Sequence, residues 1–560
     1  MAVFGIDLGT TYSVIATLDE NGKPQIIENQ DEGKATLASA IYLPAEGGDP
    51  AVGTEAKNIA ETEPDRVALF IKRYIGKENA EDIARRDGLF ASFEFNGATE
   101  TPITISSYIL KRMVEYAYQQ GYTVEDVVIT CPAYFTDEER RATRQAGENI
   151  GLNVINIINE PTAAALSYCY SGYKEDKKIL VYDLGGGTFD VTIIDMKVDD
   201  EGHVDIDAIR TGGNDKLGGV DWDNRLYDYF ATEYAEQNGI DINDLDTELI
   251  QIIKGKVEGT KISLSNVPAK TVSFIYSGEP TRVEISREKF EELTKDLVDQ
   301  TIYFVDDVLS KAGLTESNIN DVLLVGGSTL MPVIMDTVKA KFPNSNVVRS
   351  DPHLAVAKGA AIFAAHSIAE HYGNPGSEIN PEANPEPKPN PVKSGYTIRD
   401  RLSHSYGPTV LVQFSDGSEN FRIDNIAYIG DEVPLEISSS YKARSSVVEV
   451  DFYSNDSEVR DGEEHYIIPE FDIEGNKQWT EDSLNVRHMG KARLDNSHIV
   501  TGDSITVTIV VTNKGSVARV RHDNTGEEEE CEFVSAVTQS EEQTEEIKNR
   551  FQLLKTRSDV

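Results

Sequence analysis

Cysteine, tryptophan and positive charge are all scarce in this chain of 560 residues, which contains three cysteines and two tryptophans. Cys131, Cys169 and Cys531 stand far apart and form no CxxC pair, which excludes the usual zinc-ligand spacings and favours small buried apolar residues. Lys plus Arg total 53 against 96 Asp plus Glu, so the formal net charge is −43. Because such an excess of carboxylates repels nucleic-acid phosphates and anionic lipid headgroups, we expect neither nucleic acid nor a membrane as a partner.

Long apolar runs are also missing. No stretch approaches the roughly 18 apolar residues that a membrane-spanning helix needs. The first residues, MAVFGIDLGTTYS, contain no basic leader and are interrupted by Asp7, so we expect a cytoplasmic, reducing location. Apolar residues make up 39% and charged residues 27%, which is typical of a chain that folds around apolar cores.

One segment divides the chain. Residues 375–391, PGSEINPEANPEPKPNP, contain six prolines and almost no apolar side chains, which predicts an extended linker. Before it, short apolar runs such as Val3–Leu8 and Ile179–Leu184 alternate with helical spacing, which predicts α/β layers. After it, short alternating runs separated by turn residues predict an all-β sandwich. The predicted parts are 1–370 (α/β), 371–393 (linker), 394–536 (β-sandwich) and 537–560 (a short helical tail).

The large α/β part contains a concealed repeat. Asp7-Leu8-Gly9-Thr10-Thr11 follows an apolar strand and precedes a predicted β-hairpin. Residues 183–188, DLGGGT, follow another apolar strand and also precede a predicted hairpin. A single Asp-x-Gly is common turn chemistry, but two copies of strand, DLG turn and hairpin predict two similar lobes that face each other.

The glycine turns of this repeat suit phosphate binding. Consecutive backbone N–H groups without a Cβ can approach phosphate oxygens closely, and Thr10, Thr11 and Thr188 add hydroxyl donors. Asp7 and Asp183 precede the turns, where carboxylates would repel phosphates unless a cation intervened, and Mg²⁺ is the preferred cation. Two further glycine pairs are Gly218-Gly219 and Gly326-Gly327. We expect their backbone N–H groups to lie at the same cleft and to complete a nucleotide-binding site. The alternative is a set of unrelated turns stabilised by aspartates.

Several motifs carry a family resemblance over residues 1–365. They are FGIDLGTTYSVIA, VVITCPAYFTDEERRATRQAG, IINEPTAAALSY, YDLGGGTFDVTI, LGGVDWDNR and LLVGGST. In this order they resemble the ATPase half of the seventy-kilodalton heat-shock chaperones, in their bacterial form. The resemblance implies an α/β, actin-like and hexokinase-like ATPase domain of two lobes with Mg-ATP or Mg-ADP in the cleft between them, and a role in protein folding and the stress response.

The resemblance also implies roles for individual residues. Phosphates are expected on Thr10, Thr11, Tyr12, Gly185, Gly186, Gly187 and Thr188, and hydrated Mg²⁺ on Asp7 and Asp183. The expected catalytic residues are Lys72, in FIKRYIG, together with Glu160, Thr188 and Asp190. Without the surrounding motifs, Lys72 would be read as a surface lysine. The remaining expected nucleotide contacts are Gly218, Gly219, Glu258, Lys261, Ile262, Ser265, Gly326, Gly327, Ser328 and Leu330. Pro132 and Arg140 match positions that the family uses to relay nucleotide state; otherwise they are a strand-ending proline and a helix-face arginine.

The adenine site departs from the family pattern. Ile262 and Leu330 stand where the family has two arginines that sandwich the adenine, and His353 replaces an acidic residue. A cation–π stack contributes about 0.5–2 kcal/mol and a buried aliphatic side chain about 1.5–3 kcal/mol, so the two effects are comparable. We therefore expect Ile262 and Leu330 to form an apolar clamp that still binds ATP.

The region after the Pro-rich segment departs further. The best match to the family's leucine-rich linker is Thr397-Ile398-Arg399-Asp400, but its leucines are gone. We therefore expect weak apolar docking of this segment on the ATPase part and weak coupling between peptide binding and ATP hydrolysis. The β part resembles the family's peptide-binding sandwich faintly, and the alignment places Val448 and Val450 in a peptide groove; the alternative is that they are core residues. The long helical lid is missing, so we expect a bound peptide to leave quickly.

Together these observations predict an ATP-hydrolysing chaperone without a lid that binds exposed apolar segments of unfolded clients. The resemblance also implies a J-domain co-chaperone and a nucleotide exchange factor as partners. One alternative is a nucleotide-bound switch or interaction module with little hydrolysis and weak interdomain coupling. A sugar or acid kinase of the same fold is disfavoured because it would have no use for the β domain.

Overall fold

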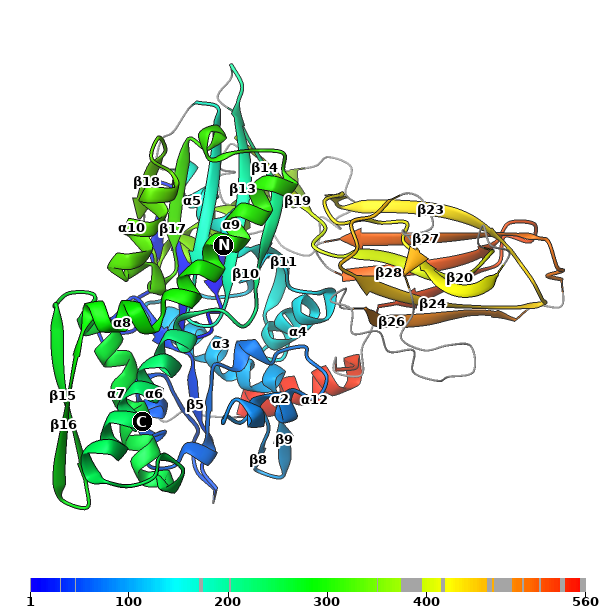
Figure 1. Ribbon diagram of the computed structural model, residues 1–560. Coiled ribbons are helices and arrows are strands. Elements are labelled where there is room, and N and C mark those ends of the chain that lie inside the picture. Colours follow the sequence, from blue (N-terminus) through cyan, green and yellow to red (C-terminus); the bar gives the residue numbers. More distant parts are fainter. Residues whose placement is uncertain are drawn as a thin grey trace. The chain divides into compact units, whose positions relative to one another are not determined.

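The fold is seen in a computed structural model of the chain (Figure 1). The structure describes residues 2–30, 32–45, 47–170, 175–200, 203–349, 351–373, 395–413, 418–460, 466–467, 486–495, 498–512, 515–533 and 539–553. Most of the predicted Pro-rich linker lies outside these residues. The chain forms two compact units: the first comprises Met1–Ala133, Thr143–Ile398 and Gln539–Val560, and the second comprises Tyr134–Ala142 and Arg399–Thr538. None of the helices in the described part is long and apolar enough to cross a membrane.

The first unit contains two sheets with the same strand plan. Each has a central strand that pairs with a parallel strand on one side and with an antiparallel hairpin on the other. The first sheet has the order β11 (Asn153–Asn159), β10 (Asp126–Cys131), β1 (Phe4–Asp7), β2 (Tyr12–Leu18), β3 (Pro24–Ile26). The second has the order β18 (Asn346–Arg349), β17 (Asp321–Val325), β12 (Lys177–Leu184), β13 (Phe189–Val198), β14 (Val204–Asn214). The internal repeat predicted from the sequence is therefore present in the strand pairing.

Two helices and one apolar cluster join the sheets. Helix α5 (Glu160–Tyr170) packs against helix α11 (Ala355–Gly373), which also contacts β1, β2 and β10. Their small side chains, among them Ala163, Ala164 and Ala360, lie in a cluster that includes residues of both sheets, such as Val128 and Ile179. Because alanine side chains are small, α5 and α11 approach each other closely, and the two sheets pack on either side of them.

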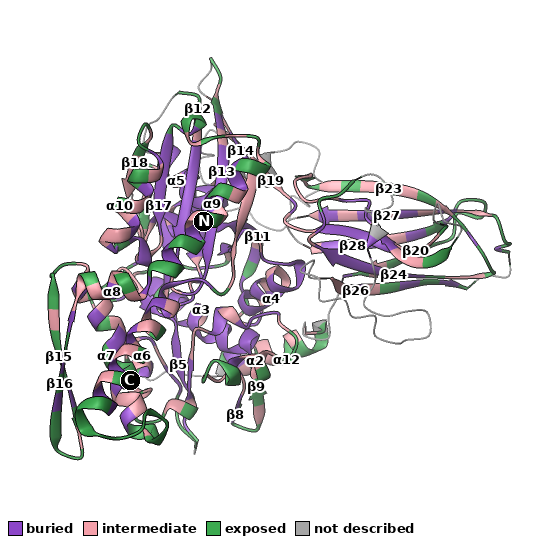
Figure 2. Ribbon diagram, in the orientation of Figure 1, coloured by how far each residue is buried: buried purple, intermediate pink, exposed green. Residues whose placement is uncertain are grey.

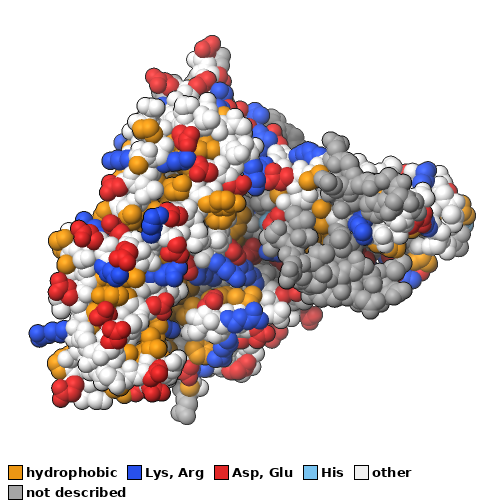
Figure 3. Space-filling view, viewed as in Figure 1, with side chains coloured by type: hydrophobic (Ala, Val, Ile, Leu, Met, Phe, Trp, Pro, Cys, Tyr) orange, Lys and Arg blue, Asp and Glu red, His pale blue; other side chains and the backbone are white. Residues whose placement is uncertain are grey.

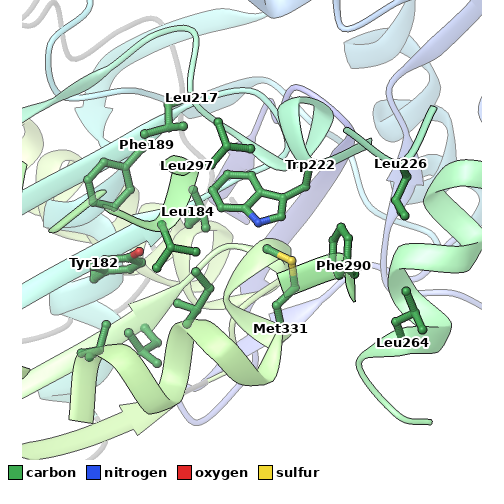
Figure 4. Packing of buried hydrophobic residues seen from close by; sticks show 14 of the residues in the cluster. Tyr182, Leu184, Phe189, Leu217, Trp222, Leu226, Leu264, Phe290, Leu297 and Met331 are labelled. Carbon is green, nitrogen blue, oxygen red and sulfur yellow. The ribbon is translucent and has the colours of Figure 1, made fainter. Parts of the chain in front are cut away.

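The largest apolar core lies on the other face of the second sheet. It is covered by helices α6 (Gly219–Asn238), α7 (Thr247–Leu264), α8 (Arg287–Leu293), α9 (Lys295–Lys311) and α10 (Pro332–Lys341). Trp222, Phe290 and Met331 point into a common interior from different elements (Figure 4). Thr294 separates α8 from α9, and its hydroxyl donates to the Phe290 carbonyl one turn earlier.

The smaller elements of the first unit lie around these cores. They are helices α1 (Thr54–Ile59), α2 (Ala80–Arg86), α3 (Pro102–Gln119) and α12 (Glu541–Leu553), the 3-10 turn η2 (Ile71–Arg73), strands β4 (Leu37–Ala38), β5 (Ala40–Tyr42), β6 (Ala51–Val52) and β7 (Val67–Leu69), and the hairpins β8 (Phe93–Phe95)–β9 (Ala98–Glu100) and β15 (Ala269–Tyr276)–β16 (Glu279–Ser286). The central strands are buried, whereas along the β15–β16 hairpin exposed residues alternate with buried ones, most of which belong to the large core (Figure 2). On the face shown in Figure 3, acidic and basic side chains are interspersed.

The second unit is built on two antiparallel sheets. It also includes the first residues of α4 (Asp137–Glu148). One sheet has the order β25 (Tyr466–Ile467), β21 (Glu419–Asp424), β20 (Ser405–Gln413), β24 (Val447–Asn455), β26 (Arg487–Asp495); the other has the order β23 (Leu435–Lys442), β27 (Ser504–Thr512), β28 (Gly515–His522), β29 (Glu528–Glu532). Along β27 every second residue is buried, as expected for a strand with one face on a core. Both sheets contribute to that core, which has the layout of a sandwich.

Candidate functional site

A cleft of about 1650 Å³ opens within the first unit, at the loop ends of the two repeated strands β1 and β12. Most of the residues singled out from the sequence line it: Asp7, Thr10, Thr11, Tyr12, Lys72, Glu160, Asp183, Gly185, Gly186, Thr188, Glu258, Lys261, Ile262, Ser265, Gly326, Gly327, Ser328 and Leu330. The cleft is larger than the 300–1,000 Å³ or so of a typical ligand pocket, so it has room for a nucleotide and water.

The two glycine turns of the repeat touch each other. A Cβ at Gly186 would lie 1.8 Å from the hydroxyl oxygen of Thr11, and a Cβ at Gly187 would lie 2.5 Å from the Thr10 methyl group. Any larger residue at either glycine would collide with the opposite turn. The turns therefore present backbone N–H groups and threonine hydroxyls from both lobes at one place, which is the arrangement that binds phosphate oxygens.

The other two glycine pairs pack against the second turn. The amide of Gly219 donates to the Gly185 carbonyl at 3.0 Å, and the Ser328 hydroxyl donates to the same oxygen at 2.8 Å. Gly326 has a φ of +83°, and a Cβ there would lie 2.2 Å from the Leu184 carbonyl oxygen. The structure thus brings together the glycine pairs that the sequence places more than 100 residues apart.

Four carboxylates surround one ammonium group at the base of the cleft. Lys72, in η2, forms a buried ion pair with Glu160 at the start of α5, and their side chains are 5% and 9% exposed. Burial alone would lower the pKa of Lys72, but the charges of Glu160 and Asp7 outweigh it and raise that pKa. Lys72 is therefore protonated at neutral pH, a fixed positive charge at this point.

Burial disfavours the charged form of the aspartates at this site. Burial, together with the charge of Glu160, raises the pKa of Asp7 to about 7. Burial and the neighbouring carboxylates likewise raise the pKa values of Asp183 and Asp190 well above their usual range. The single positive charge of Lys72 does not neutralise these carboxylates, so a bound cation would reduce the excess negative charge of the site.

That charge excess fits a hard, oxygen-seeking divalent ion such as Mg²⁺. Asp7 is the last residue of β1 and Asp183 the last but one of the equivalent strand β12, so they approach the cleft from both lobes. Among the described residues, no three His, Cys, Asp or Glu side chains converge as a direct metal site. The donor set fits an ion whose other ligands are water and phosphate oxygens.

The adenosine side of the cleft is apolar and open. Ile262 and Leu330 line the cleft and are 54% and 39% exposed, so both leave apolar surface open to a ligand. Lys261, one turn from Ser265 on α7, donates to Asp223 and to the Gly219 carbonyl at 2.7 and 2.8 Å. The His353 ring lies against Gly327, where a Cβ would be 2.6 Å from the ring.

Sequence reasoning missed two cations of the cleft. Lys57 on α1 forms an ion pair with Glu258 on α7, and the Tyr12 hydroxyl donates to Glu258 at 3.4 Å. Arg73 donates to the Gly187 carbonyl at 2.9 Å and pairs with Asp221 at 2.7 Å. Arg73 could have been found as the neighbour of Lys72, whereas nothing in the sequence around Lys57 marks it.

The predicted relay and groove residues are not among those that line the cleft. Pro132 is buried directly after β10, and Arg140 on α4 donates through Nε to the Phe135 carbonyl at 3.0 Å. Arg140 lies in the segment Tyr134–Ala142, which groups with the second unit. In that unit, Val450 is 6% exposed within the core between the sheets, and Val448 packs half-buried against the same core.

The segment after the Pro-rich stretch makes apolar contacts although the expected leucines are absent. Strand β19 (Tyr396–Arg401) adds to the sheet beside β14, and Tyr396 and Ile398 pack against the apolar cluster that joins the sheets. Tyr396 stacks on Tyr170 with ring centroids 6.4 Å apart, and Thr397 is 2.7 Å from a ring nitrogen of His203. An aromatic ring and an isoleucine thus take the place of the expected leucines.

Comparison with protein families gives the same assignment as the motifs. The family model described as Hsp70 protein matches residues 3–370, more than half of the chain. The match spans both glycine turns, Lys72 and the other cleft residues, and it confirms the resemblance found in the sequence. Members of this family are in general Mg-ATP-binding ATPases that act as chaperones with co-chaperones. The chain belongs to the Hsp70 family.

Proposed function

We propose that this protein is an ATP-dependent chaperone that binds and hydrolyses Mg-ATP in the cleft of its first unit. The observation that carries the proposal is the buried Lys72–Glu160 pair beside the two interlocked glycine turns. A buried lysine with a raised pKa, next to carboxylates and backbone donors, is what phosphoryl transfer requires, because that reaction depends on positioning and charge compensation.

Each group has a defined task in this proposal. The backbone N–H groups of residues 185–188 and the hydroxyls of Thr10, Thr11 and Thr188 bind the phosphate oxygens. Asp7 and Asp183 hold the water shell of Mg²⁺, which supplies charge neutralisation of the phosphates when it is bound. Lys72 would neutralise charge on the γ-phosphate and orient the attacking water, and Glu160, its ion-pair partner, would complete the polar cage with Asp190.

The apolar surface of Ile262 and Leu330 forms the adenine clamp of this proposal. Both side chains line the cleft and remain exposed, so a flat aromatic base can cover them. The favourable free energy comes from removing apolar surface from water, at about 25 cal/mol per Å². Glu258, Lys261 and Ser265 supply polar contacts on the same helix.

The second unit would bind extended apolar segments of unfolded proteins, in keeping with the family. Since Val450 is a core residue here, exposed positions of the sheets rather than Val450 would contact a client. Pro132 and Arg140 would relay nucleotide state, and a J-domain protein and an exchange factor would act as partners. The grouping of residues 134–142 with the second unit supports that relay.

The variant Lys72→Ala tests the ATPase proposal. We expect its kcat to fall about 100-fold or more, as when one preorganised electrostatic donor is removed from other active sites. Because the change leaves Glu160 unpaired, nucleotide binding is measured by calorimetry to show that the variant is folded. Lys256→Ala, an exposed lysine on α7 outside the cleft, is the matched control and should hydrolyse like the wild type.

The same measurement separates the alternative function. If the wild type turns over no faster than Lys72→Ala while both bind Mg-ATP, the chain is a nucleotide-bound switch or interaction module rather than a working ATPase. If neither protein binds Mg-ATP, both readings are wrong.

A further inference from the structure

The C-terminal helix α12 follows the second unit in the chain but packs as part of the first unit. Its start is well defined, because Ser540 and Gln543 form reciprocal side chain-to-backbone hydrogen bonds of 2.8 and 3.2 Å. This pattern is a capping box, which fixes the first turn of a helix. The N-terminus of α12 is therefore defined by its own local sequence.

One face of α12 is directed at the first unit. The less exposed positions are Thr544, Ile547, Lys548, Arg550 and Phe551, and all but Arg550 are spaced three and four residues apart as on one side of a helix. Phe551 is 2% exposed, and its ring lies 4.7 Å from that of Tyr108 on α3 at an angle of 60°. The neighbouring Gln552 is exposed, so the apolar contact is confined to one face.

The buried carboxylate of Glu100 forms an ion pair with Arg550 of α12. Arg550 donates to Glu100 at 3.0 Å, and the Glu100 side chain is 1% exposed. The Tyr108 hydroxyl donates to the other oxygen of Glu100 at 3.2 Å. Without Arg550, a carboxylate out of reach of water would lose its charged partner, which is costly in a protein interior. This part of the first unit is therefore shaped to accept an arginine beside an aromatic ring.

A second polar contact lies before the helix. The Gln145 side chain donates to the Gln539 carbonyl at 2.7 Å and accepts from the Gln539 amide at 3.1 Å. The stem of Lys548 also lies over Gly151, where a Cβ would be 3.6 Å away. Contacts thus run along the whole segment from Gln539 to Phe551 and involve β9, α3 and the region after α4.

The helix depends on these contacts for its order. Helices shorter than about 12–15 residues are marginal in water on their own, and α12 has 13 residues. The face on the first unit would in turn be left with an open apolar ring, Tyr108, and a buried unpaired carboxylate, Glu100. Helix and surface are complementary in shape, apolar character and charge.

We propose that α12 is an intramolecular latch that holds the C-terminal end of the β-sandwich region on the ATPase domain. The other end of that region is held by β19, whose first residues pack in the first unit. Residues 399–538 are therefore attached at both ends, like a domain inserted into the ATPase domain. Such attachment supplies in this chain a second connection that does not pass through the Pro-rich segment.

Amide hydrogen exchange of the full-length protein tests the latch. We expect residues 541–553 to be protected in the wild type, and we expect Phe551→Ala to speed their exchange at least tenfold because an undocked helix of this length frays. Arg550→Ala should speed it by a smaller factor. Gln552→Ala, an exposed neighbour on the same turn, is the matched control and should exchange like the wild type.

A cleavage experiment tests the attachment itself. A protease site is placed within residues 375–391 of the full-length protein, and the cut protein is analysed by size-exclusion chromatography. Because β19 also packs in the first unit, every cut protein in this comparison carries Ile398→Asp, which releases β19. The fragments should then stay together with the native α12 and with Gln552→Ala, and separate at least partly with Phe551→Ala. Coil-like exchange of residues 541–553 in the wild type, unchanged exchange in Phe551→Ala, or separation of the fragments with the native α12 would each overturn the latch. Thermal melting and nucleotide binding show that the variants are folded.

Discussion

Asp7 ends the buried strand β1, where burial and the charge of Glu160 raise its pKa to about 7 from an ordinary 3.8. Between these two pH values the folded protein binds a proton that the unfolded chain has lost. The free energy of unfolding of the nucleotide-free protein therefore decreases as the pH rises from about 4 to about 7. The same carboxylate becomes favourable when a cation is bound beside it.

The variant Asp7→Asn should remove the part of this pH dependence that Asp7 contributes, while Asp183 and Asp190, whose pKa values are also raised, keep theirs. We expect it to unfold at a higher temperature than the wild type at pH 8 without nucleotide, and to gain much less at pH 5, where the wild-type carboxyl is already protonated in the fold. The Thr130 hydroxyl, which donates to Asp7 at 3.2 Å, can also donate to the asparagine oxygen. Equal gains at both pH values would contradict the assigned pKa.

Ile262 and Leu330 decide how the nucleotide base is held. Truncating either to alanine removes part of the apolar surface that the base would cover, so we expect an ATP affinity about tenfold weaker, or about 1.4 kcal/mol. Ile262→Arg should bind ATP within a few-fold of the wild type, because a cation–π stack replaces the apolar contact. Competition with a fluorescent nucleotide measures all three. Alanine variants that bind like the wild type would show that the base lies elsewhere.

At the scale of elements, the local parts of the site could be predicted and the long-range parts could not. The turns at Gly185–Thr188 and Thr10–Thr11 were predictable because glycine and aspartate after an apolar strand specify a turn whatever surrounds it. The sequence also predicted the repeat, since each hairpin is a local unit. The ion pair of Lys57 with Glu258, which joins α1 to α7, leaves no local signal.

The docking of β19 was mispredicted for a related reason. The sequence predicts weak contact because the leucines of the family's linker are absent. Tyr396 and Ile398 instead pack, partly buried, against a cluster whose other members come from distant strands and helices. Such complementarity depends on the folded surface, which the segment itself does not encode.

The variant Ile398→Asp should release β19 from the first unit, because a carboxylate placed against an apolar cluster is not compensated there. We expect amide exchange at residues 396–398 to increase at least tenfold, with the helix α11 still protected as evidence that the domain is folded. Thr397→Ser keeps the hydroxyl that faces His203 and serves as the control. If Ile398→Asp left the exchange of β19 unchanged, the apolar contact would not be what holds this strand.

At the scale of the whole molecule, the question is whether nucleotide and client are linked. Each unit has apolar clusters of its own, the largest packed on the second sheet in the first unit and between the two sheets in the second unit. Separate cores can fold independently, so any linkage must pass through the chain segments that the units share: the region around Arg140, β19 and, if the latch is correct, α12. A chaperone cycle requires that linkage, whereas a nucleotide-bound switch does not.

Linkage makes a quantitative prediction that does not depend on the route. If ATP changes the affinity for an extended apolar peptide by some factor, the peptide must change the affinity for ATP by the same factor. Using Lys72→Ala to block turnover, we expect a factor of at least five in both directions, measured by peptide anisotropy and by calorimetry of Mg-ATP binding. In the wild type the same peptide should increase ATP turnover several-fold. Equal peptide affinities with ATP and ADP, together with a flat turnover rate, would mean that the units act independently, and the switch would then be the better description of this protein.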